Sequence, residues 1–160
     1  MAWACGRLPS RSYAARDCVR LSVRGGGLQA KTISGERVVV DTSILIAVVF
    51  EEAHAEWAVG QLSEHAPRLR MSTVNLAETL ILIRDRQPQL YDELEAQILE
   101  LGIRFVAPDV AQARLAAEAR VRFPLNLGDC FAYALACEED CPILTLDQDF
   151  RAVDREVILP

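Results

Sequence analysis

Several features that mark common protein classes are scarce or missing in this chain of 160 residues. Long apolar runs are absent: Ile44–Phe50, for example, falls far short of the roughly 20 residues that span a bilayer. Lysine occurs once, at Lys31, and histidine only at His54 and His65. Because no Cys-x2-Cys or His-x3-His spacing occurs, a structural zinc site is not expected. We therefore expect a protein with neither a membrane span nor a zinc-stabilised fold.

Disulfides are not expected either. The five cysteines are an odd number, and three of them, Cys130, Cys137 and Cys141, follow the middle of the chain. We interpret these three as reduced, buried thiols of a cytoplasmic protein. With 51% apolar residues, the chain has enough apolar material for the core of one domain.

The net charge of −6 conceals an uneven distribution. Residues 1–37 carry +5 and the remainder carries −11. A domain of −11 is a poor non-specific ligand for nucleic acid, since phosphate binding requires clustered Lys and Arg. Any role in nucleic-acid chemistry must therefore depend on a local site.

Residues 1–37 differ from the rest of the chain. They combine scattered Arg with Pro9 and the run Gly25–Gly27, and they show no period of 2 or 3.6. Neither an amphipathic transit peptide nor an apolar signal sequence is recognisable. We expect a disordered or non-native leader over 1–37 and a single domain over 38–160.

The predicted domain alternates strands with helices. Val38–Val40 is a β-branched apolar run, typical of a strand buried on both faces of a parallel sheet. Further strands are expected near 69–71, 103–106, 142–146 and 157–159. Helices are expected at 44–50 (capped by Ser43), 53–64 with Trp57, Val59 or Gly60 and Leu62 inward, 74–86 with Val74, Ala77, Leu80, Ile81 and Ile83 or Arg84 inward, 89–101 ending at Gly102, 109–122 and 129–139. This order predicts an α/β fold: a three-layer α/β/α domain with a central, mostly parallel sheet of four to five short strands.

Four acidic residues occupy positions where such a sheet forms its cleft. Asp41 follows the first strand, Asp147 follows the fourth, and Asp129 opens the last long helix. Glu78 lies in the first turns of an otherwise apolar helix. Ligands of open parallel sheets bind beyond the carboxyl ends of the strands, so these side chains are expected to lie close together.

A shared site for four carboxylates requires a cation. Each acid alone could be a helix cap, a turn residue or a surface ion-pair partner. Together, with no basic residue nearby in the sequence, they would repel one another and raise their own pKa values. A hard divalent cation resolves this repulsion, and Mg²⁺, with Mn²⁺ as a second possibility, suits carboxylate oxygens.

Four sequence segments resemble the ordered motifs of PIN-domain nucleases, and within these the VapC toxins of prokaryotic toxin–antitoxin pairs. The segments are Val38–Ser43, Asn75–Glu78, Leu125–Ala134 and Leu144–Phe150. The resemblance covers residues 38 to about 159 and none of the leader.

The resemblance implies a Mg²⁺-dependent endoribonuclease that cleaves RNA, is neutralised by a cognate antitoxin and forms a homodimer. It assigns Asp41, Glu78, Asp129 and Asp147 as catalytic and metal-binding acids, with Ser43 and Thr145 in supporting positions. Alignment on the Thr-x-Asp pattern selects Asp147 as the fourth acid, whereas alignment on Phe150 selects Asp149.

Two other interpretations stay open at this point. One is a PIN-like domain that binds protein or RNA with weak or no catalysis. The other is an aspartate-based phosphatase, although that chemistry requires a second Asp where Ser43 stands and a Lys after the first strand. For RNA cleavage the acidic domain needs local cations, and Arg84, Arg86 and Arg122 are the candidates. Serine hydrolase chemistry is not expected, because His54 and His65 both fall in or at the end of one helix.

Overall fold

A computed structural model describes residues 37–160, and its centre is a five-stranded parallel sheet. The strands follow the spatial order β3-β2-β1-β4-β5, and every neighbouring pair is parallel. Their bounds are β1 Val38–Val40, β2 Leu69–Ser72, β3 Arg104–Val106, β4 Ile143–Leu144 and β5 Val157–Ile158. The prediction of a parallel α/β sheet with short strands is confirmed.

Six α-helices and two 3₁₀ turns connect the strands of the described chain. The helices are α1 Thr42–Val49, α2 Ala55–His65, α3 Thr73–Arg86, α4 Tyr91–Leu99, α5 Val110–Arg122 and α6 Leu127–Glu139, and the 3₁₀ turns are η1 Pro88–Leu90 and η2 Gln148–Ala152. The predicted helix at 89–101 is thus divided between η1 and α4, and it ends before Gly102. None of the described helices is long and apolar enough to cross a membrane.

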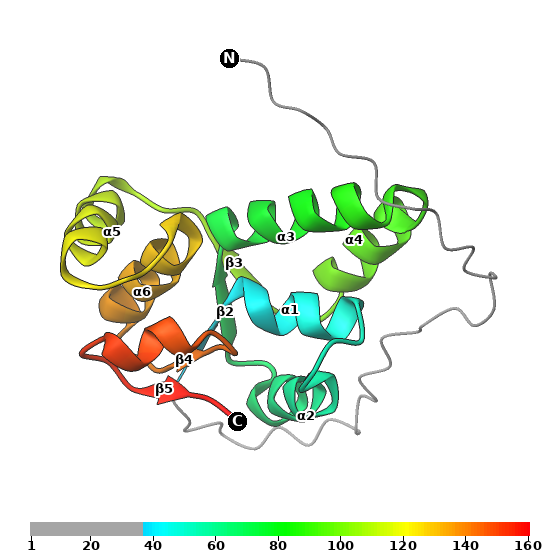
Figure 1. The fold of residues 1–160 in the computed structure, drawn as a ribbon, viewed down its shortest axis with the longest axis horizontal. Helices are drawn as coiled ribbons and strands as arrows, with labels where there is room; N and C mark the ends of the chain where they lie inside the picture. Colours follow the sequence, from blue (N-terminus) through cyan, green and yellow to red (C-terminus); the bar gives the residue numbers. More distant parts are fainter. Residues whose placement is uncertain (1–36) are drawn as a thin grey trace, which may run out of the picture.

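The helices form two layers, one on each face of the sheet (Figure 1). Val38 and Val40 face a core shared with α1, α2, α3 and α4. Val39, between them, faces the second core with α5 and α6. A strand covered on both faces has no polar side, which is why β1 is an uninterrupted valine run.

The topology fixes where a cleft forms. The chain moves from β1 outward to β2 and β3, then returns across the sheet to β4 beside β1. The strand order therefore reverses between β1 and β4, and ligands of open α/β sheets bind at the carboxyl end of such a reversal. Asp41 and Thr145 immediately follow these two strands.

Two inward helix faces differ from prediction. In α2 the buried residues are Ala58 and Leu62, whereas Val59 is 38% exposed. In α3 they are Asn75, Thr79 and Ile83, whereas Ile81 is 67% exposed. The predicted inward set for α3 followed apolar side chains, but the first turns of this helix lie over a polar region beyond the strand ends, so polar residues are buried there.

Two helix starts also differ from prediction. Helix α1 begins at Thr42 with Asp41 as its N-cap, since the Asp41 carboxylate accepts a hydrogen bond from Ser43 N; Ser43 is not the cap. Helix α6 begins at Leu127, two residues before the predicted start. Its cap is Asn126, which exchanges hydrogen bonds with Asp129 in a capping box.

Of the predicted leader, only Arg37 belongs to the described residues, where it pairs with Glu139 at 3.2 Å. The prediction for the rest of 1–37 lies outside them. Cys130 and Cys141 are buried and free, and Cys137 is free but half-buried, so the prediction of three buried thiols is correct for two.

Candidate active site

Asp41 is the fixed centre of the polar region at the carboxyl edge of the sheet. Its side chain is 2% exposed. Oδ2 accepts three hydrogen bonds, from Ser43 Oγ at 2.7 Å, from Thr145 Oγ1 at 2.9 Å and from Ser43 N at 3.2 Å. Burial raises the pKa of Asp41, and the bonds from Ser43 and Thr145 oppose this rise. These hydrogen bonds orient the Asp41 carboxylate and stabilise its ionised form.

Thr145 and Ser43 also connect β4 to this carboxylate. The Thr145 hydroxyl accepts a bond from Asp147 N at 2.9 Å while it donates to Asp41. Ser43 Oγ accepts a bond from Leu146 N at 2.9 Å. The two hydroxyls therefore fix the segment that carries Asp147 against Asp41. Residues that support the acids would have to form such hydrogen bonds, which is the role that the resemblance implies for Ser43 and Thr145.

Glu78 is oriented by two residues whose roles the sequence analysis did not identify. Thr42 Oγ1 donates a 2.6 Å hydrogen bond to Glu78 Oε2. Asn75 Nδ2 donates to the same Thr42 hydroxyl at 3.2 Å and to Asp41 Oδ1 at 3.3 Å. Asn75 is fully buried. It thus connects the first acid with the Thr42–Glu78 pair.

Asp129 enters the same region from α6. Its Oδ2 accepts a 2.8 Å bond from Asn126 N. Gly128 precedes it and lies against Glu78: a Cβ built on Gly128 would overlap Glu78 Oε2 and lie 3.1 Å from Glu78 Cδ. The missing side chain at position 128 is therefore what allows α6 and the Glu78 carboxylate to approach each other.

The charges of the other three acids act on Asp129. The pKa of Asp129 is raised from 3.8 to about 7, mainly by burial and to a smaller extent by the charges of Asp41, Asp147 and Glu78, while the hydrogen bond from Asn126 N opposes the rise. Asp129 therefore lies within the electrostatic reach of the three other predicted acids at this edge of the sheet. Asp149, the alternative fourth acid, is exposed, and its backbone N–H donates to Asp147 Oδ1 at 2.9 Å.

The donor set suits a hard divalent cation. Four carboxylates from four segments lie at this edge of the sheet, and a positive charge among them would lower the raised pKa of Asp129. Asn75 Oδ1 is buried without a hydrogen-bond partner among residues 37–160, so it can accept a bond from an ordered water. No three acidic, His or Cys side chains of the described chain already surround one point at metal-binding distance. Such an arrangement is compatible with Mg²⁺, because this ion commonly binds only one or two carboxylates and keeps several of its water ligands.

The arginines suggested as cations for RNA are engaged elsewhere. Arg86 pairs with Glu52 at 2.8 Å, and Arg122 pairs with Asp154 at 2.7 Å. The Arg84 guanidinium lies 3.7 Å from the centre of the Tyr91 ring. Arg84 and Arg86 also lie in the last turn of α3, away from Glu78. These surface contacts orient the three side chains, and their role as local cations for RNA stays a prediction.

The spacing of polar residues in the sequence could have identified Asn75 and Thr42 as members of the site. Asn75 and Glu78 are three residues apart, so they share a face of a helix, and Thr42 directly follows Asp41. Polar residues at helical spacing inside apolar sequence indicate a buried polar network rather than an apolar stripe.

Comparison with known proteins gives consistent matches to this chain. The PIN domain family matches residues 38–156. A ribonuclease VapC of Mycolicibacterium smegmatis is 37% identical over 125 residues, which are 73% of this chain and 96% of that protein.

Solved structures show the same fold at lower identity. The VapC20 toxin of Mycobacterium tuberculosis, described as cleaving the sarcin–ricin loop, superposes with a TM-score of 0.67 at 22% identity, covering 77% of this chain and 99% of that one. A toxin–antitoxin complex from Klebsiella pneumoniae gives 0.61 at 19% identity, covering 76% and 95%.

Proposed function

Because this chain belongs to the PIN-domain family and, within it, to the VapC ribonucleases, we propose that it is a Mg²⁺-dependent endoribonuclease toxin neutralised by a cognate antitoxin. The observation that carries the proposal is the set of contacts at the reversal of strand order: Asn75 and Thr42 connect Asp41 with Glu78, Gly128 beside Asp129 lies against Glu78, and Thr145 connects Asp41 with the backbone of Asp147. The fit of this donor set to Mg²⁺ supports the cofactor, and Mn²⁺ is its natural substitute.

The reaction is the hydrolysis of an RNA phosphodiester. A water oxygen attacks the phosphorus, the bond from phosphorus to O3′ breaks, and the products carry 5′-phosphate and 3′-hydroxyl ends. When bound, Mg²⁺ supplies stabilisation of the phosphate charge and activation of water. Asp41 and Asp147 would hold the cation: Thr145 donates to the Asp41 carboxylate and accepts from the Asp147 backbone N–H, and Asp149 N donates to Asp147 Oδ1.

Asp129 and Glu78 are the candidates to position the attacking water and accept its proton. Burial raises the pKa of Asp129 to about 7 in the metal-free protein, and a cation in the cluster would lower it, so the ionised carboxylate is the form that would accept the proton of the water. The hydrogen bond from Thr42 orients Glu78 through Oε2, and Oε1 of the same carboxylate would bind the attacking water.

An antitoxin, a homodimeric state and a cytoplasmic location complete the proposal. The Klebsiella pneumoniae neighbour is a toxin–antitoxin complex, which supports a protein partner for this chain too. A cleft with four carboxylates attracts a basic side chain, and Arg inserted there would compete with Mg²⁺ for the same oxygens. Raising Mg²⁺ should then weaken inhibition in the purified pair.

The test of the enzymatic proposal is cleavage of total RNA by the purified full chain, with Mg²⁺ and with EDTA, followed by mapping of the product ends. We expect cleavage only with Mg²⁺, and 5′-phosphate ends at the cuts. Products with 2′,3′-cyclic phosphate, or equal cleavage in EDTA, would contradict metal-assisted hydrolysis. A complete lack of cleavage would favour the binding-only alternative.

A further inference from the structure

Asn75 lies where α1, α3 and α6 meet at the proposed active site. It belongs to the first turn of α3, and its side chain is fully buried. Its Nδ2 donates to Asp41 Oδ1 at 3.3 Å, to Thr42 Oγ1 at 3.2 Å and to the backbone oxygen of Gly128 at 3.2 Å. Asn75 Oδ1 has no hydrogen-bond partner among residues 37–160, so within this range the amide acts only as a donor.

The three acceptors belong to three different parts of the acid cluster. Asp41 is itself one of the acids, and Thr42 passes the contact on, because its hydroxyl donates to Glu78. Gly128 is the residue before Asp129 in the first turn of α6. An amide nitrogen carries two hydrogens, so at least one of them is shared between two of these acceptors. One NH₂ group therefore acts on three of the four acids.

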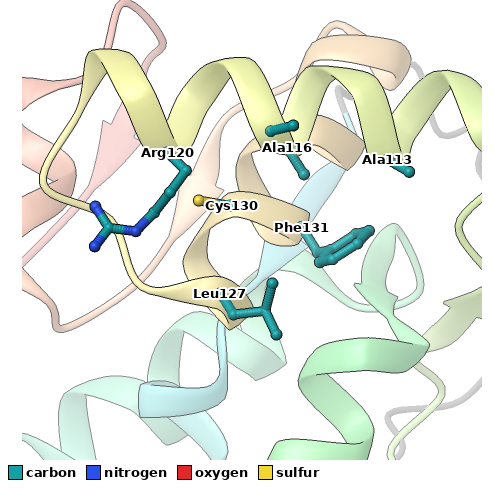
Figure 2. A pocket seen from close by; sticks show the side chains of 7 residues that line it. Ala113, Ala116, Arg120, Leu127, Cys130 and Phe131 are labelled. Carbon is teal, nitrogen blue, oxygen red and sulfur yellow. The ribbon is translucent and has the colours of Figure 1, made fainter.

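The bond to Gly128 acts on the first turn of α6 from the side of the acid cluster. On the side that faces α5, Leu127 is 70% exposed and lines a largely apolar groove of about 280 Å³ (Figure 2). Packing against α5 therefore leaves space beside this turn. The capping box between Asn126 and Asp129 is a local contact and does not connect α6 to another helix. The amide of Asn75 supplies such a connection, from α3 to α6.

We infer that Asn75 is a positioning residue of the proposed nuclease: its amide hydrogens hold Asp41, Glu78 and the start of α6 in the arrangement that cleavage uses. This inference rests on the proposed function. Because the side chain is fully buried, it acts through these neighbours and does not contact RNA. A neutral donor suits the position, since a carboxylate would repel the acids and a basic side chain would neutralise them.

The test first measures cation binding without RNA. Mn²⁺ is titrated into the purified full chain, and the free ion is followed by electron paramagnetic resonance. Asn75→Leu removes both donor hydrogens and keeps a branched side chain. We expect its Kd for Mn²⁺ to rise about tenfold, because the acids keep their charges but lose their common orientation.

RNA cleavage at saturating Mn²⁺ is the second measurement. In Asn75→Leu, kcat should fall at least about tenfold while KM for RNA stays within about twofold, as expected for a residue that orients reacting groups and does not bind substrate. Asn75→Asp keeps the shape of the side chain, removes the donors and adds a negative charge. It should bind Mn²⁺ at least as tightly as the wild type and still cleave RNA at least about tenfold more slowly, which separates the orientation of the acids from their charge.

Gln112→Leu is the matched control. Gln112 is 3% exposed, and its Oε1, like Asn75 Oδ1, is buried without a hydrogen-bond partner in the described part of the chain. Its amide donates to Glu138, near the end of α6 that lies away from Asp129. Mn²⁺ affinity and cleavage by this variant should equal those of the wild type. Melting curves in Mn²⁺ show which variants are folded at the assay temperature, and if Asn75→Leu is not, Asn75→Asp decides.

The outcomes distinguish this inference from the proposed function. If the wild type binds Mn²⁺ and cleaves RNA, and the folded Asn75 variants cleave at the wild-type rate, Asn75 is not a positioning residue and the function stands. If Gln112→Leu loses as much Mn²⁺ affinity and cleavage as Asn75→Leu, the loss reflects general stability and the inference is wrong. If the wild type neither binds Mn²⁺ nor cleaves RNA, the proposed function itself fails.

Discussion

The hydroxyl of Thr42 donates a 2.6 Å hydrogen bond to Glu78 Oε2, joining the first residue of α1 to an acid 36 positions later. Asn75 donates to this hydroxyl, so the Thr42 hydrogen is directed at Glu78. The orientation of Glu78 therefore depends on a neutral hydroxyl that no acid-based motif includes.

Removal of this hydroxyl should impair catalysis without unfolding the domain. We expect Thr42→Val to reduce the cleavage rate about tenfold, because Glu78 loses its fixed orientation and Asn75 loses an acceptor. Thr42→Ser keeps the hydroxyl and should retain most activity. Rates on a defined RNA, measured over a range of Mg²⁺ concentrations, check this. Equal loss in Thr42→Ser and Thr42→Val would indicate a packing defect instead.

Asp41→Asn should abolish cleavage while leaving the fold intact. Asparagine has the same shape, and its carbonyl oxygen can accept the bonds from Ser43 and Thr145 that hold Asp41. The missing negative charge weakens cation binding, and we expect at least a hundredfold loss of rate. Because burial raises the pKa of Asp41, the neutral side chain should not lower the melting temperature by more than a few degrees. Full Mg²⁺-dependent activity in this variant would remove Asp41 from the site.

The identity of the fourth acid can be decided by a matched pair of variants. Asp147 is half-buried and connected to Asp41 through Thr145, whereas Asp149 is exposed. We expect Asp147→Asn to reduce cleavage at least tenfold and Asp149→Asn to leave it within about twofold. Both rates come from the same RNA assay. A larger loss at Asp149 would select the alignment on Phe150.

The sequence predicted the order of elements well because each depends on local signals. The valine run of β1 and the Asp109 cap of α5 act within a few residues. The inward face of α3 depended instead on tertiary position: Asn75 and Thr79 are buried because this helix starts over the polar cleft. Likewise, no sequence pattern showed that Arg122 is paired, because its partner Asp154 lies 32 positions later in the chain.

Gly128→Ala should damage the site through Glu78. A methyl group on Gly128 would overlap Glu78 Oε2, and the flexible carboxylate, rather than the backbone, would move away. We expect a folded protein with cleavage reduced about tenfold or more. Gly60→Ala is the control, because a Cβ there meets nothing within 4 Å and alanine favours the helix by up to about 1 kcal/mol. Wild-type cleavage by Gly128→Ala would show that Glu78 need not occupy its observed position.

The acid cluster should make the metal-free protein less stable as pH rises. The pKa of Asp129 is about 7 in the fold and near 3.8 when unfolded, so between these values the folded state holds a proton that the unfolded state releases. The free energy of unfolding should therefore fall from about pH 4 to pH 7 and change little above it. Allowing for solvent screening, we expect a contribution of about 1–2 kcal/mol, or several degrees in melting temperature.

Asp129→Asn isolates this contribution from those of the other carboxylates. Melting curves in EDTA at constant ionic strength, from pH 5 to pH 8, should show the variant gaining stability relative to the wild type as pH rises. Mg²⁺ should raise the wild-type melting temperature at pH 8, because it binds the ionised cluster. It should have a smaller effect on the variant, which has lost one carboxylate. Parallel pH curves for the two proteins in EDTA would mean that Asp129 ionises in the fold as it does in the unfolded chain, and that the four acids do not share the repulsion from which the cation site was inferred.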